Sequence, residues 1–168
     1  AYHFDGYWKD VGTIPSLWEA NMEVLDPEHS GINLFDENWK IYSRNSGMTG
    51  HKISDGGVVE NSMITDGCRI AGTVRHSVLF AGVRVEKDAV VEDAVVMGGT
   101  VIRSGAVVRH CIVAENVEIG EHAVVGSMPD ASGNGVATIG SGITIGAEAK
   151  IGPNAMVTKN IEGGEEQW

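Results

Sequence analysis

The stretch Ser77-Val-Leu-Phe-Ala-Gly-Val-Arg-Val-Glu-Lys-Asp-Ala-Val-Val-Glu-Asp-Ala-Val-Val96 decides the fold. In it a large apolar residue follows a small or β-branched residue two places earlier, as at Leu79, Val85, Val91 and Val96. These large residues are separated by steps of 6, 6 and 5. No helical period of about 3.6 residues produces that spacing, and simple strand alternation does not sustain it.

The same spacing extends in both directions and arranges the large residues in three columns. After an interruption near residue 130, four further members follow at steps of 6. The columns are Ile64, Leu79, Val96 and Val113; Ile70, Val85, Ile102 and Ile119; and Val91, Val108 and Val125 with Val74 as an irregular first member; the later members are Ile139, Ile145, Ile151 and Val157.

Three columns in register predict a hexapeptide-repeat solenoid, in which each hexad is a short strand plus a turn and three hexads close one coil. Strand pleating turns residues i−2 and i to the same side, so the narrow interior takes one small and one large side chain. Successive coils pair through parallel ladders, and about five coils fit the chain. The fold class is therefore mainly β, a parallel β-helix. An ordinary β-sandwich is the alternative, although alternating strands alone do not give three columns.

The regions outside the repeat are expected to form other structures. Residues 14–25 read as an amphipathic helix with Thr13 as its N-cap, stopped by Asp26-Pro27. We expect strands at the start of the chain and over 39–43, a surface loop over 127–135, and a tail over 162–168 that caps the last coil. The predicted divisions are residues 1–26, a connector over 27–51, and the β-helix over 52–168.

Composition limits the function classes. The net charge of −11 argues against nucleic acid or an anionic membrane as partner, while leaving room for one local basic pocket. No apolar run is long enough to span a bilayer and no signal peptide is visible, so a cytoplasmic location is expected. Cys68 and Cys111 occupy small inward positions of the repeat, which predicts two reduced, buried thiols.

Several motifs resemble bacterial ADP-glucose pyrophosphorylases (glucose-1-phosphate adenylyltransferases). They are Gly6-Tyr-Trp-Lys-Asp-Val-Gly-Thr13, Trp18-Glu-Ala-Asn-Met22, Asn38-Trp-Lys-Ile-Tyr-Ser-Arg-Asn45, Asn61-Ser-Met-Ile-Thr-Asp-Gly-Cys68 and Gly152-Pro-Asn-Ala-Met-Val-Thr158. The resemblance implies a C-terminal portion with a left-handed β-helix for assembly and allosteric control. It also implies that residues 1–26 are a remnant of the nucleotidyltransferase domain, and that the protein is a homo- or hetero-oligomer.

The family reaction joins ATP and glucose 1-phosphate into ADP-glucose, releases pyrophosphate and belongs to glycogen synthesis. By resemblance, Asp10 is the catalytic aspartate that helps hold Mg²⁺, and Trp8 binds substrate near the sugar. Read without the resemblance, Asp10 is a turn residue, and Trp8 is equally a packing residue. One carboxylate cannot run phosphoryl transfer, and the chain contains no suitable glycine-rich phosphate loop, so we expect no activity from these 168 residues alone.

The repeat contains a second candidate site. Arg84 resembles a position associated with anionic sugar-phosphate effectors, and Arg109 and Arg75 lie on similar outward positions. The simpler interpretation is a solvated face that balances an acidic protein.

Three other functions remain open from the sequence. A hexapeptide-repeat acyltransferase would use a histidine as general base, with His76, His110 and His122 as candidates. A purely structural assembly module would bind nothing small. A related pyrophosphorylase with another base or sugar would share the same C-terminal portion.

Overall fold

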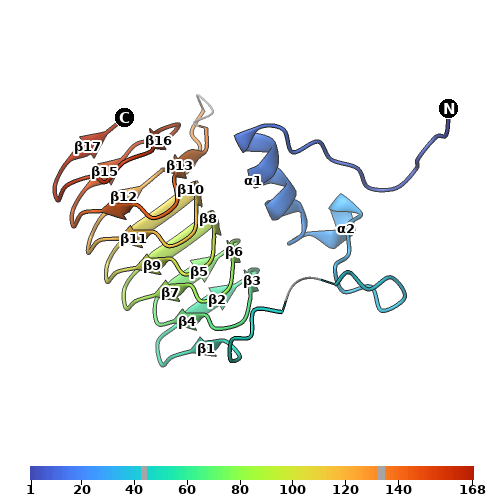
Figure 1. Cartoon of the computed structure of the whole chain (residues 1–168), viewed down its shortest axis with the longest axis horizontal. Helices are drawn as coiled ribbons and strands as arrows, with labels where there is room; N and C mark the ends of the chain where they lie inside the picture. The colour runs from blue at the N-terminus through green and yellow to red at the C-terminus, as the bar shows by residue number, and fades with distance from the viewer. Residues whose placement is uncertain (43–44, 132–134) are drawn as a thin grey trace.

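The computed structural model describes residues 1–42, 45–131 and 135–168. Its main body is a triangular solenoid of short parallel strands that rises from β1 to β17 (Figure 1). Every strand pair recorded in the described ranges is parallel, which confirms the solenoid and rules out the sandwich.

The strands stack on three faces. The first face contains β1 (Lys52–Ile53), β4 (Arg69–Ile70), β7 (Arg84–Val85), β9 (Val101–Ile102), β11 (Glu118–Ile119) and β14 (Thr144–Ile145). The second contains β2 (Val58–Glu60), β5 (Thr73–Arg75), the first halves of β8 (Val90–Val96) and β10 (Val107–Val113), then β12 (Val124–Val125), β15 (Lys150–Ile151) and β17 (Glu166–Gln167). The third contains β3 (Met63–Ile64), β6 (Val78–Leu79), the second halves of β8 and β10, then β13 (Ala137–Ile139) and β16 (Met156–Val157). In the described residues the first and third faces thus have six rungs and the second has seven, more than the expected number of about five.

The three predicted columns are the core. Ile70 aligns with Val85, Leu79 with Val96, and Val91 with Val108, and all six side chains are fully or almost fully buried. Val74, the irregular member, aligns with Val91 and belongs to the same column.

Both cysteines face inward with no exposed surface and are unpaired, as expected from their small inward positions. Burial raises the pKa of the Cys111 thiol to about 12 and also raises the pKa of the Cys68 thiol. Both thiols therefore remain protonated and unreactive near neutral pH.

Two corners of the prism bend without interrupting a strand. β8 and β10 run through Asp93 and His110, whose φ angles are 50° and 44°. His76 occupies the equivalent corner one coil earlier, with a φ of 42°. The left-handed conformation turns the chain from the second face to the third, which stacks these polar residues along one edge.

The predicted N-terminal helix is confirmed as α1 (Ile14–Glu23). The Thr13 hydroxyl accepts a hydrogen bond from the backbone N–H of Ser16, and the Ser16 hydroxyl accepts one from the backbone N–H of Thr13, which forms a capping box. The helix lies against the third face, where Met22 is buried with Val78, Val95 and other apolar side chains (Figure 1). A short helix that the sequence analysis missed, α2 (Pro27–Ser30), follows directly. No helix in the described ranges is long and apolar enough to cross a membrane.

Two expected strands do not form. Residues 1–12 and 39–42 contain no strand, and position 43 lies outside the described residues. The side chains of Trp39, Ile41 and Tyr42 are largely exposed. Apolar and polar residues alternate there, which suggested a strand, but the described residues have no neighbouring strand edge to pair with.

The expected loop and cap agree with the structure where it is described. Residues 127–131 and 135 contain no strand, while positions 132–134 lie outside the described residues. In the tail, β17 pairs with β15 and adds a rung to the second face. The Trp168 ring lies over Gly152, where an added Cβ would approach it to 2.5 Å. The tail therefore covers part of the last coil.

Candidate functional site

The N-terminal residues singled out from the sequence lie on an exposed segment that is tied to α1. The Lys9 ammonium forms ion pairs with Glu19 at 2.9 Å and Glu23 at 2.7 Å, and the Tyr7 hydroxyl donates to Glu23 at 2.6 Å. These contacts raise the pKa of Lys9 and lower the pKa of Glu23. Trp8, in contrast, is 77% exposed.

Asp10 forms a local turn in this segment. Its Oδ1 accepts a hydrogen bond from the backbone N–H of Gly12 at 3.0 Å. No group of three His, Cys, Asp or Glu side chains that could hold a metal ion occurs in the described part of the chain. Mg²⁺ takes only one or two protein carboxylates when phosphates supply other ligands, so Asp10 fits as one ligand but does not form a site by itself.

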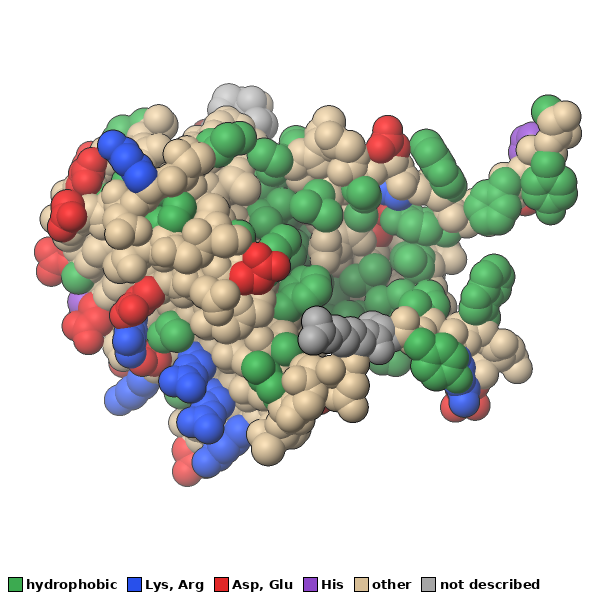
Figure 2. All heavy atoms as spheres, in the orientation of Figure 1, with side chains coloured by type: hydrophobic (Ala, Val, Ile, Leu, Met, Phe, Trp, Pro, Cys, Tyr) green, Lys and Arg blue, Asp and Glu red, His purple; other side chains and the backbone are tan. Residues whose placement is uncertain are grey.

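A column of three cations lies on the first face, and we call it the basic ladder: Lys52, Arg69 and Arg84. Lys52 aligns with Arg69, and Arg69 aligns with Arg84, so the three side chains leave successive rungs about 4.8 Å apart. Figure 2 shows basic side chains gathered over β1, β4 and β7. All three are exposed, and no ion pair is recorded for any of them among the described residues.

A like-charge ladder is unfavourable for the fold. Like charges directly opposite on neighbouring strands repel one another. The next position on this face is Val101, so no carboxylate neutralises Arg84 from the adjacent rung. In a chain with a net charge of −11, acidic residues were available to relieve this repulsion. Three adjacent, uncompensated positive charges are an arrangement that can bind an anion.

Arg109 and Arg75 lie in a different electrostatic setting. On the second face, Glu60, Arg75, Glu92 and Arg109 align rung by rung with alternating sign. The Arg109 Nε is 3.1 Å from Glu92 Oε2, and the Arg75 Nε is 2.8 Å from Glu60 Oε2. The structure therefore places Arg84 and Arg109 on different faces and pairs Arg109 with a carboxylate.

Two grooves flank the basic ladder. One, of about 610 Å³, is lined by Met48, Thr49, Gly82, Arg69 and Arg84 among other residues. The other, of about 600 Å³, is lined by Thr49, Gly50, Lys52 and Arg69 among others. Arg69 and Thr49 border both grooves, so the cations and the preceding connector form a continuous polar surface.

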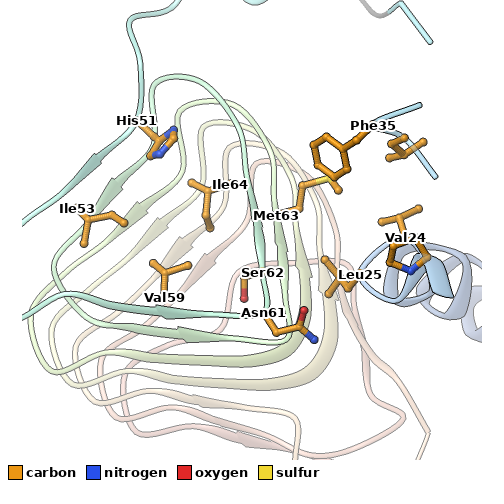
Figure 3. A pocket seen from close by; sticks show the side chains of 12 residues that line it. Val24, Leu25, Phe35, His51, Ile53, Val59, Asn61, Ser62, Met63 and Ile64 are labelled. Carbon is orange, nitrogen blue, oxygen red and sulfur yellow. The ribbon is translucent and has the colours of Figure 1, made fainter. Parts of the chain in front are cut away.

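Another cavity lies away from the basic ladder and has a different character. It encloses about 630 Å³ between the end of α1, the connector and the first coil. Figure 3 shows Ile53, Val59 and Ile64 pointing into the prism, with Leu25 and Phe35 on the far wall. The lining is mostly apolar, and Ile53 is 46% exposed. The cavity thus continues the core at the first coil and carries none of the charges of the basic ladder.

The three candidate histidines are not grouped as one site. The His76 Nδ1 contacts the Asp93 carboxylate, while His122 is exposed on a turn. His110 is 7% exposed, its Nδ1 has no hydrogen-bond partner in the described structure, and the Trp18 ring covers it. Desolvation lowers the pKa of His110, with a weaker opposing effect from Asp93. An imidazole buried under an indole ring is a packing arrangement.

Sequence reasoning found Arg84 but missed Lys52 and Arg69. The signal was present, because each cation directly precedes a member of one apolar column: Ile53, Ile70 or Val85. Aligning the hexads by column, rather than searching for isolated arginines, brings the three cations together.

Comparison with known proteins places this geometry among hexapeptide-repeat proteins. A family model described as "GlmU-like, C-terminal hexapeptide" matches residues 48–146. The glucose-1-phosphate adenylyltransferase of Bacillus mycoides (strain KBAB4) is 56% identical over 99 residues, which are 59% of this chain and 26% of that protein. The protein of the same name from Bacillus anthracis is 54% identical over 99 residues, again 59% of this chain and 26% of that protein. The chain therefore spans about a quarter of the length of the curated relatives that it matches.

One solved structure shows a similar fold. It is the acetyltransferase domain of PglB from Neisseria gonorrhoeae FA1090 in complex with acetyl coenzyme A. The TM-score is 0.50 at 19% sequence identity, over 71% of this chain and 54% of that one. At this identity the likeness concerns the fold alone.

Proposed function

Because this chain belongs to the GlmU-like C-terminal hexapeptide family, we propose that it is the C-terminal regulatory and assembly part of a glucose-1-phosphate adenylyltransferase. The full protein would join ATP and glucose 1-phosphate into ADP-glucose and pyrophosphate. The identity of 54–56% over 99 residues to proteins of that name supports this proposal. The oligomer and the cytoplasmic location belong to the same proposal.

The residues of this chain would contribute to the reaction mainly from outside the reacting centre. Mg²⁺, when bound, would screen the phosphates of the two substrates from one another. Asp10 would provide one carboxylate ligand, and Trp8, exposed two residues earlier, would pack near the sugar. The remaining ligands and phosphate contacts would come from residues outside these 168, so we expect the isolated chain not to synthesise ADP-glucose.

The regulatory role rests on a single observation, the uncompensated basic ladder. Three cations on successive rungs match a phosphate-bearing ligand, since guanidinium groups bind phosphate oxygens through paired charge-assisted hydrogen bonds. We propose that an anionic sugar-phosphate effector binds at Arg84, with Lys52 and Arg69 beside it. Arg109 remains a predicted effector residue, but Glu92 already neutralises its charge.

Phosphate binding to the 168-residue chain tests the ladder. We expect inorganic phosphate to raise the melting temperature of the wild type, and Arg84→Ala to weaken the apparent affinity about tenfold, the loss typical of one charge-assisted contact. The affinity should also fall as sodium chloride is added. Before phosphate is added, Arg84→Ala should not lower the melting temperature, because it removes repulsion.

The matched control is Arg75→Ala, which removes an arginine from the alternating ladder of the second face. It should leave phosphate binding unchanged. Arg109→Ala, measured in parallel, tests the second predicted effector residue. If the wild type shows no phosphate-dependent shift, or if Arg75→Ala weakens binding as much as Arg84→Ala, the ladder is not an anion site.

A further inference from the structure

A short piece of the connector lies across the turns next to the basic ladder. We call residues 45–50 the strap. The Met48 side chain covers two turn glycines: a Cβ added at Gly67 would lie 2.5 Å from its Sδ, and one at Gly82 would lie 3.1 Å from its Cε. Both glycines have positive φ angles, 74° and 77°. Because the two glycines have no Cβ, the Met48 side chain can pack directly against these turns.

Few other interactions hold the strap. The backbone N–H of Gly67 donates to the Thr49 carbonyl at 2.6 Å, and the Ser46 hydroxyl donates to Asp66 at 3.4 Å. Met48 itself is 50% exposed. An element with so few buried contacts opens at small free-energy cost compared with the solenoid strands.

The strap also borders the two grooves that flank the basic ladder. Thr49 lines both grooves, with Lys52 in one and Arg84 in the other, and Arg69 borders both. A ligand held by the ladder would therefore touch the strap. Such a ligand would gain its contacts with the strap when Met48 is packed on the glycines, so it would favour that packed state.

We propose that the strap is a closing wall of the anion site, seated by a phosphate-bearing ligand through Met48 as the positioning residue. This inference rests on the proposed function, because it requires an anion at the basic ladder. Its consequence is regulatory: the strap continues into the connector, so occupancy of the ladder would change the freedom of the chain that leads back to α2 and α1.

Hydrogen exchange on the 168-residue chain, with inorganic phosphate as the probe, tests the strap. Saturating phosphate should slow exchange at the Gly67 amide, which is bonded to Thr49, and leave the amides of the distant rungs unchanged. Met48→Ala should abolish that protection and weaken phosphate binding about fivefold, the effect expected from losing a half-buried methionine. The matched control, Met156→Ala, removes a methionine that is 59% exposed on β16 and should change neither measurement.

The outcomes separate the two proposals. If Arg84→Ala weakens phosphate binding but Met48→Ala does not, and phosphate leaves Gly67 exchange unchanged, the strap inference is wrong and the anion site stands. If the wild type binds no phosphate, both are wrong. A urea midpoint for Met48→Ala close to that of the wild type shows that the solenoid itself is intact.

Discussion

Replacing Trp18 by alanine tests how the N-terminal helix is held on the solenoid. The Trp18 Nε1 donates to the Asp93 carbonyl at 2.7 Å, and its ring meets His110 edge-on with centroids 4.5 Å apart. Truncating a core tryptophan costs about 3–5 kcal/mol, and Trp18 is only half-buried, so we expect about 3 kcal/mol. The cost should fall on docking of α1, because the apolar columns inside the prism do not contact this ring.

A loss of about 3 kcal/mol corresponds to roughly a hundredfold increase in the undocked population. The ten-residue helix is too short to persist alone in water, so undocking also unfolds it. Native-state hydrogen exchange should therefore show about a hundredfold faster exchange at the Leu17 amide, which is bonded to the Thr13 carbonyl. The Arg103 amide, bonded to the Ile119 carbonyl inside the stack, should keep its protection.

Trp8→Ala is the matched control, because Trp8 is 77% exposed and contributes little packing. It should leave both amides as they are in the wild type. Unchanged protection of α1 in Trp18→Ala would refute the docking described here. Equal loss at Leu17 and Arg103 would show instead that helix and solenoid unfold as one unit.

Two further predictions concern stability. Ile102→Ala removes a fully buried column residue and should lower the free energy of unfolding, measured by urea denaturation, by about 2–5 kcal/mol. Val124→Ala, at an exposed position, should lower it much less. Similar losses in the two variants would contradict the assignment of the core. Burial lowers the pKa of His110 below its ordinary 6.5, so the unfolded chain binds this proton more tightly and the free energy of unfolding should decrease as the pH falls through 6.5. His110→Asn, which tolerates the positive φ angle, should reduce that pH dependence between about pH 7.5 and 5.5. An unchanged pH dependence would refute the assignment. The exposed His29, whose pKa Asp26 raises, contributes with the opposite sign and cancels in the comparison of the two proteins.

Hexad spacing predicted the solenoid because it is a strict geometric constraint. Each coil must bring its large residue back to the same column of the prism, so the spacing between apolar residues determines the strand register. Val74 illustrates this strength: its spacing was irregular, yet it aligns with Val91 as the column required. The helix over residues 14–25 was equally legible from its N-cap and its 3.6-residue period, and it ends only two residues early.

The absence of strands from the N-terminal segments could not be predicted in the same way. Alternation over residues 39–43 describes a face, but a strand also needs a neighbouring edge, and residues 39–42 have none. The sequence also could not show which arginines of the repeat are paired with carboxylates. Arg84 and Arg109 look alike in the sequence, and only the alignment of rungs shows that Glu92 neutralises Arg109 while Arg69 stands beside Arg84.

The geometry also constrains how an anion at the basic ladder could influence the N-terminal segment. The strap lies over turn glycines at the corner between the third and first faces, whereas α1 docks on the third face near the opposite corner, at Asp93 and His110. The connector is a direct covalent link between them, anchored at one end by Trp18 at the Asp93 carbonyl and at the other by Met48 on the turn glycines. Coupling through a tether of this kind requires both anchors. Trp18→Ala should therefore leave phosphate affinity at the ladder intact while uncoupling α1 from it, a separation that transmission through the solenoid core would not produce.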